Sequence, residues 1–158
     1  MRQASTERKN EFLRKLAFLL EKNVGNILVA NKRDIETGSH LSSAMRKRLE
    51  LSEKSIAAMA QALRVVADMP DPVGQVIRSW TRSDGLRINR VRTPIGVIAC
   101  IFESRPNIII DIAALCVKSG NAVIVRGGKE ALHSNSALLS YITEALISAG
   151  LPRDAIQE

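Results

Sequence analysis

Apolar residues in the first 70 positions recur at every third or fourth residue, a spacing that predicts amphipathic helices. Ser5 and Ser52 precede two of these patterns and suit helix N-caps, whereas Gly38 suits a helix end. We therefore expect helices after Ser5, over 23–36, over 45–49, and from Ser52 to about residue 67. The basic residues of the short third helix are expected to form a solvated face.

The pattern changes to alternation in the middle of the chain. Residues 75–82 and 86–92 alternate apolar and basic side chains on either side of an Asp84-Gly85 pair, which predicts a β-hairpin. An isolated hairpin has strand edges that proteins usually cover or pair. On the residues alone, a subunit contact and a simple surface ribbon are equally favoured.

The last third predicts a βαβ unit with parallel strands. The apolar runs 95–102 and 122–125 are typical of strands buried on both faces. Residues 108–118, apolar on all sides, suit a buried helix between them, and 129–149 has a long helical pattern. Such a unit is right-handed. Ile156 is expected to begin a further strand, so the predicted fold class is α/β.

Two polar loops follow the predicted strands at the edge where parallel sheets bind ligands. In the first, 126–130, the glycines allow a close backbone approach and Arg126 suits a phosphate. The following helix N-terminus is expected to offer free N–H groups to an anion. The alternative, a plain strand-to-helix turn, is equally open. The second loop, 103–107, carries donors and charge, and Asn107 also suits a helix N-cap.

Composition excludes several classes of protein. The 158 residues are 46% hydrophobic and 25% charged, which is typical of a globular chain. No apolar run reaches the roughly 20 residues of a membrane span, and no signal peptide is evident, so we expect a cytoplasmic protein. The net charge of +7 raises the possibility of nucleic-acid binding, but the basic residues are dispersed and only 3% of residues are aromatic. A solvated basic surface is favoured, and it also suits anionic ligands.

The cysteines and histidines predict no metal site and no nucleophile. Cys100 and Cys116 fall in buried patterns and are expected to be reduced core thiols rather than a disulfide or a catalytic group. His40 is expected in a solvated loop, and His133 is expected to be a surface or helix-packing residue. Asp111 lies within an apolar helix, so we expect it to be paired or near the site.

Several segments together resemble the γ-glutamyl phosphate reductases, also called glutamate-5-semialdehyde dehydrogenases, of the aldehyde dehydrogenase superfamily. The segments are PIGVI, ESRPN, DIAALC, KSGNAVIVRGG and KEALHSN, with NILVANKRDIETG, LSSAMRKRLELS and MPDPVGQVI upstream. They cover nearly the whole chain. The resemblance implies NADPH-dependent reduction of L-glutamyl 5-phosphate to L-glutamate 5-semialdehyde, with release of phosphate, in proline biosynthesis.

The resemblance also implies a division of the chain. Residues 1–74 would be the helical part of a Rossmann-like NADP-binding domain, and 94–158 its incomplete βαβ part. Residues 75–93 would be an oligomerisation hairpin, which implies a homo-oligomer. The catalytic domain and its nucleophilic cysteine would lie outside this chain. We therefore expect an N-terminal part of a longer protein that is inactive alone.

Site residues carry over from the family by position. Arg126 falls where relatives contact the adenosine ribose, and a guanidinium there suits the 2′-phosphate of NADP. Gly127, Gly128, Lys129 and Glu130 complete the implied cofactor loop.

In the other loop, Asn107 corresponds to an oxyanion donor, and Arg105 is a candidate clamp for the substrate's carboxylate or phosphate. The alternatives are a non-catalytic nucleotide-binding or oligomer-forming fragment, part of a bifunctional pyrroline-5-carboxylate synthase, and a basic nucleic-acid-binding module.

Overall fold

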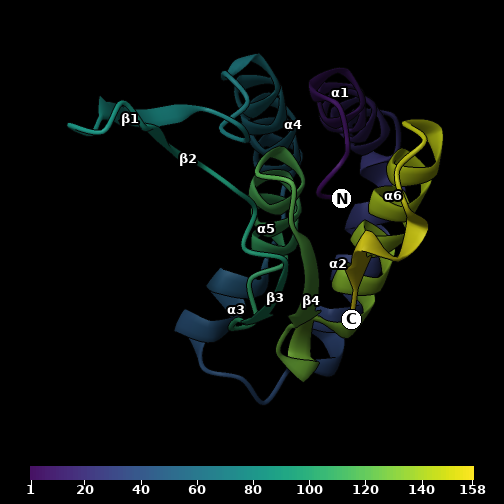
Figure 1. Ribbon diagram of the computed structural model, residues 1–158. Helices are drawn as coiled ribbons and strands as arrows, with labels where there is room; N and C mark the ends of the chain where they lie inside the picture. Colours follow the sequence, from purple (N-terminus) through teal and green to yellow (C-terminus); the bar gives the residue numbers. More distant parts are fainter.

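The computed structural model describes residues 1–158 and begins with four helices (Figure 1). They are α1 (Thr6–Lys22), α2 (Val24–Thr37), α3 (Ser43–Leu49) and α4 (Glu53–Asp68). Ser5 accepts a hydrogen bond from the Arg8 N–H group, and Ser52 forms a capping box with Ser55. The N-terminal helices are therefore positioned as the sequence predicts. None of the helices in the structure combines the length and apolar character needed to cross a bilayer.

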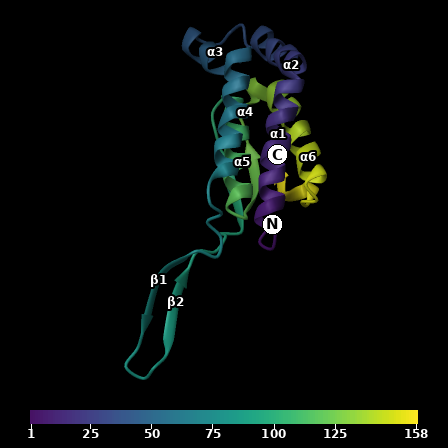
Figure 2. The same ribbon diagram turned by 90° about the horizontal axis from the view of Figure 1, so that it is seen from above.

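The predicted hairpin is present and projects away from the rest of the molecule (Figure 2). Its strands, β1 (Val76–Thr81) and β2 (Arg87–Val91), are antiparallel, with Trp80 opposite Ile88. Every residue of β1 is exposed. The hairpin therefore contributes nothing to the core of this chain.

The C-terminal part forms a three-stranded parallel sheet in the order β3-β4-β5. Its elements are β3 (Val97–Ile101), α5 (Asn107–Lys118), β4 (Ala122–Arg126), the 3₁₀ turn Lys129–Ala131, α6 (Leu132–Ser148), the 3₁₀ turn Arg153–Ala155, and β5 (Ile156–Gln157). The predicted α/β fold class and parallel βαβ unit are confirmed. Helices α1, α4, α5 and α6 pack together on one side of this sheet.

The prediction that both strands are buried on two faces is wrong. Val123 and Val125 point into a core of 29 residues and are each 1% exposed. In contrast, Val97, Ile101 and Ile124 are 68%, 85% and 52% exposed. An apolar run shows that both faces of a strand tolerate burial, but it does not show that the chain supplies an element to cover each face.

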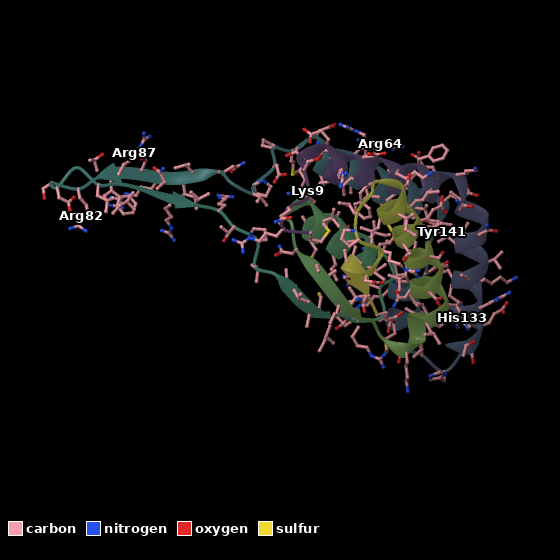
Figure 3. The ribbon with its side chains drawn as sticks, turned by 45° about the vertical axis from the view of Figure 1, so that its right-hand side comes forward. Lys9, Arg64, Arg82, Arg87, His133 and Tyr141 are labelled. Atoms are coloured by element: carbon pink, nitrogen blue, oxygen red, sulfur yellow. The ribbon has the colours of Figure 1, made fainter.

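A buried ion pair joins the base of the hairpin to α1. Lys9 is 1% exposed, and its Nζ donates to Oδ2 of Asp71 at 2.8 Å. Thr6 Oγ1 and the Val73 N–H group also donate to this carboxylate, each at 2.9 Å. Burial alone would raise the pKa of Asp71, but the hydrogen bonds outweigh it and hold that pKa below its usual value. The segment that leads into β1 is thereby fixed to the helices, and Figure 3 shows Lys9 between the two.

Candidate functional site

The two predicted site loops meet at the carboxyl edge of the sheet. Ile101 pairs with Arg126, so β3 and β4 end at the same level. A hydrogen bond then joins the loops, because Ser104 Oγ donates to Oε2 of Glu130 at 2.7 Å. This bond is the main reason that the pKa of Glu130 is lowered. The structure thus brings residues 103–107 and 126–130 together.

A cavity of about 340 Å³ lies between these loops and α3, with six lining residues: Met45, Arg48, Glu103, Ser104, Gly128 and Glu130. Arg48 Nη1 donates to Oε2 of Glu103 at 2.8 Å. The sequence predicts only a solvated face for α3. Arg46, Lys47 and Arg48 are indeed exposed, and the structure in addition places Arg48 against the 103–107 loop, so that α3 lines this cavity.

The turn after β4 is packed on both sides. Neither Gly127 nor Gly128 has a positive φ, so space rather than backbone conformation requires glycine. A Cβ atom on Gly127 would collide with Nδ2 of Asn135, and one on Gly128 would collide with Ser104 Oγ. The N–H groups of Gly127, Gly128 and Lys129 form no hydrogen bond within the chain. Three adjacent unpaired N–H groups suit an anionic ligand.

The unpaired charges at this edge are positive. The side chains of Arg105, Arg126 and Lys129 are exposed and form no ion pair, whereas the acidic members of the site, Glu103 and Glu130, are each bound by a neighbour. A phosphate-bearing nucleotide fits this set, because it would meet free guanidinium, ammonium and backbone N–H donors.

The free N–H groups that the sequence predicts at the start of the last helix lie just before α6, at residues 127–129, rather than on α6 itself. A 3₁₀ turn precedes α6, and Asp34 of α2 caps the helix. Its carboxylate accepts from the N–H groups of His133 and Ser134 at 2.9 and 2.7 Å, and from Ser134 Oγ at 2.6 Å. Asp34 is 3% exposed, so this end of α6 is closed to other anions. No local pattern predicts the cap, because its partners are about 100 residues apart in sequence.

Asn135, in the first turn of α6, has surroundings that the sequence does not predict. It is 1% exposed, and neither Nδ2 nor Oδ1 has a hydrogen-bond partner. Leaving a buried polar group unpaired costs about 1–3 kcal/mol. Because Asn135 lies against Gly127, the unpaired amide is part of the surroundings of the Gly127-Gly128 turn.

In the 103–107 loop, the alternative that Asn107 caps the following helix is wrong. Pro106 occupies the N-cap position, and no side chain caps α5. Asn107 Nδ2 instead donates weakly to Oδ2 of Asp111, one turn along, at 3.5 Å. Burial raises the pKa of Asp111, and this bond partly offsets it. The predicted pairing of Asp111 is therefore present.

The thiols lie in β3 and α5, whereas both imidazoles line a pocket beside Lys129 and Glu130. Cys116 is buried in α5, and burial, followed by the nearby Cys100, raises the pKa of its thiol. Cys100 is half-buried on β3, and both cysteines are free. His40, in the loop after α2, and His133, at the start of α6, are both exposed. Figure 3 shows His133. No three His, Cys, Asp or Glu side chains gather in a way that could hold a metal ion.

Comparisons with known proteins identify the family. The sequence model of the aldehyde dehydrogenase family matches residues 1–157. This chain belongs to the aldehyde dehydrogenase family. Among its members, the γ-glutamyl phosphate reductase of Bartonella tribocorum is 50% identical over 156 residues, which are 98% of this chain and 38% of that protein. The reductase of Moorella thermoacetica is 52% identical over 154 residues, 96% of this chain and 37% of that protein.

Solved structures of the aldehyde dehydrogenase family agree with this assignment. The γ-glutamyl phosphate reductase of Thermotoga maritima superposes with a TM-score of 0.94 at 43% identity, over 99% of this chain and 38% of that one. The γ-glutamyl phosphate reductase of Saccharomyces cerevisiae superposes with a TM-score of 0.93 at 34% sequence identity. The match covers 99% of this chain and 41% of the yeast chain. Glyceraldehyde-3-phosphate dehydrogenase of Methanocaldococcus jannaschii, solved with NADP, superposes with a TM-score of 0.70 at 15% sequence identity, over 99% of this chain and 32% of that one. At this identity the likeness shows the fold alone. The resemblance to the reductases is confirmed, and the chain spans about 38% of the length of the curated relatives.

Proposed function

We propose that this chain is the nucleotide-binding part of a γ-glutamyl phosphate reductase, and that it binds NADPH at the carboxyl edge of β3 and β4. The observation that carries the proposal is about 50% identity to such reductases over nearly the whole chain. The reaction of the whole enzyme is then reduction of L-glutamyl 5-phosphate to L-glutamate 5-semialdehyde, with release of phosphate, in proline biosynthesis. The cytoplasmic location expected from the sequence stays a prediction.

The turn after β4 is assigned to the cofactor. The exposed guanidinium of Arg126 suits the 2′-phosphate, which favours NADPH over NADH. The unpaired N–H groups of Gly127, Gly128 and Lys129 suit a phosphate oxygen. Glu130, kept ionised by Ser104, is a hydrogen-bond acceptor for ribose hydroxyls. When bound, NADPH supplies the hydride for the reduction.

The loop after β3 is assigned to the small-molecule substrate. The free guanidinium of Arg105 would bind the carboxylate or phosphate of glutamyl phosphate. Asn107 would donate to the acyl oxygen, where negative charge develops. A thiolate nucleophile must be accessible and easily ionised. Cys116 is buried and burial raises the pKa of its thiol, and Cys100 is half-buried on β3, outside both site loops. We therefore assign the nucleophile to a segment outside these 158 residues.

The hairpin is assigned to assembly of a homo-oligomer. Both strands are open to solvent, and apolar Val76, Ile77 and Trp80 are 55%, 53% and 41% exposed. Unpaired strand edges with apolar side chains favour pairing with another chain. Light scattering of the purified protein tests this assignment.

The test of the nucleotide site is a fluorescence titration of the folded chain with NADPH and with NADH. Arg126→Ala removes a charge-assisted contact, so we expect NADPH affinity to fall about 10- to 100-fold. Affinity for NADH should change much less. Arg87→Ala, on the hairpin far from the site, removes the same charge and should bind as wild type (Figure 3). Failure of the folded wild-type chain to bind NADPH would contradict the proposal.

A further inference from the structure

Asn135 is an exception among the buried amides of this chain. Asn31 is equally buried, at 1% exposed, and fully paired: its amide donates to the Leu49 carbonyl at 2.8 Å and to Ser134 Oγ at 3.0 Å, and it accepts from the Leu51 N–H group at 2.8 Å. Asn135 makes no such bond with either side-chain atom. Buried polar groups are almost always paired, so the unpaired amide of Asn135 requires an explanation.

Asn135 lies beside the turn after β4, which carries the candidate nucleotide site. A Cβ atom on Gly127 would meet Asn135 Nδ2 on one side and the Phe102 ring at 3.2 and 3.3 Å on the other. The amide of Asn135 therefore lies directly against the Gly127 backbone. The N–H and carbonyl groups of Gly127 are also unpaired. Since an amide side chain carries both donors and an acceptor, it can pair with either group after a small rotation of the peptide.

We propose that Asn135 is a positioning residue that couples the Gly127-Gly128 turn to nucleotide binding. The inference rests on the proposed function, because it takes a phosphate-bearing nucleotide as the ligand. In the ligand-free chain the amide is unpaired. When a phosphate draws the free N–H groups of the turn toward itself, the Gly127 peptide rotates and its carbonyl accepts from Asn135 Nδ2. The unpaired amide raises the free energy of the ligand-free state, whereas the bond from Asn135 to the Gly127 carbonyl lowers that of the nucleotide-bound state. The difference between the two states strengthens nucleotide binding.

A purely space-filling role for Asn135 makes different predictions. In that case the side chain contributes volume to the helix–sheet contact, and its loss lowers stability without changing nucleotide affinity. In the coupling role, its loss hardly changes the stability of the ligand-free chain but weakens binding. The two roles thus differ in two independent measurements.

The experiment compares Asn135→Ala with the matched control Asn31→Ala, because both remove the same atoms from equally buried positions. The thermal midpoint of the ligand-free chain and the dissociation constant for NADPH are measured for each. We expect Asn31→Ala to lower the midpoint clearly more than Asn135→Ala, since it breaks three hydrogen bonds. We expect Asn135→Ala to weaken NADPH binding about three- to tenfold, the worth of one hydrogen bond, and Asn31→Ala to leave it unchanged below its midpoint.

Asn135→Leu is the second variant, because it fills the space without an amide. It should bind NADPH as weakly as Asn135→Ala and melt no lower than that variant. Wild-type affinity in either Asn135 variant would overturn the inference while leaving the nucleotide site intact. A folded wild-type chain that does not bind NADPH would overturn the proposed function and the inference together.

Discussion

Polar groups at the base of the hairpin have hydrogen-bond partners, whereas several polar groups at the carboxyl edge of the sheet have none. At the hairpin base, Lys9 and Lys118 are both buried, and each has short hydrogen bonds: Lys9 to Asp71 at 2.8 Å, and Lys118 to Asn10 and the Ala67 carbonyl at 2.6 and 2.9 Å. At the carboxyl edge of the sheet, exposed cations, backbone N–H groups and one buried amide have no partner. Even the buried lysines of this chain are hydrogen-bonded, so the unpaired groups stand out at the carboxyl edge of the sheet, where we expect a ligand. We infer that paired groups set stability and unpaired groups set binding.

The largest expected effect is at the hairpin base. Asp71→Asn leaves the buried ammonium of Lys9 without a counter-charge, so we expect a loss of about 3–5 kcal/mol in the free energy of unfolding. NADPH affinity, measured while the variant is folded, should not change. Urea unfolding at pH 7 gives the first quantity, and the fluorescence titration gives the second.

The pH dependence of the same variant sharpens this prediction. The folded-state pKa of Asp71 is lowered, so its stabilising contribution is present above the unfolded value of about 3.9 and is lost as pH falls through the lower folded value. The stability difference between wild type and Asp71→Asn should therefore shrink below about pH 4. The double variant Lys9→Met/Asp71→Asn, which removes both charges, should recover much of the loss. No recovery would contradict the ion-pair account.

A middle-sized effect is expected at Asp34, a paired group that lies close to the site. Asp34→Ala leaves the first N–H groups of α6 uncapped and Ser134 without its acceptor, so we expect a loss of about 2–4 kcal/mol. Asp34→Asn, which keeps an acceptor oxygen, should lose less. Because α6 begins beside the turn, some loss of NADPH affinity is also expected. If Asp34→Ala melted as wild type, the cap would have no energetic role.

The smallest stability effects are expected at the unpaired cations. Arg126→Ala and Lys129→Ala remove exposed side chains that contact no charged partner, so each should change the free energy of unfolding by less than about 0.5 kcal/mol. Chemical unfolding of both variants beside wild type measures this. A loss above about 1 kcal/mol in either would contradict the separation between stability and binding.

Local chemistry made much of the fold predictable. Ser5 and Ser52 cap helices as their types suggest, and Asp84-Gly85 closes the hairpin. The βαβ unit follows from two apolar runs around one helix. These features depend on residues a few positions apart, which a sequence pattern can show.

What the sequence could not show depends on segments that meet only in the folded chain. Asp34 reaches the start of α6 across about 100 positions, and Lys9 reaches Asp71 across 62. Arg48 meets Glu103 across 55 positions, a contact that adds α3 to the lining of the cavity beside the two loops. Asn135 gives no signal of being unpaired, because its partners are decided by packing alone.

The most direct test of the account is a pair of thermal unfolding curves for the wild-type chain, without and with NADPH. A ligand that binds only the folded state adds about 2.7 kcal/mol of stability at 100 times its dissociation constant. We predict that the midpoint rises with NADPH concentration, and that NADH at equal concentration raises it less. A midpoint unchanged by saturating NADPH would contradict the claim that the unpaired groups at the carboxyl edge form a nucleotide site.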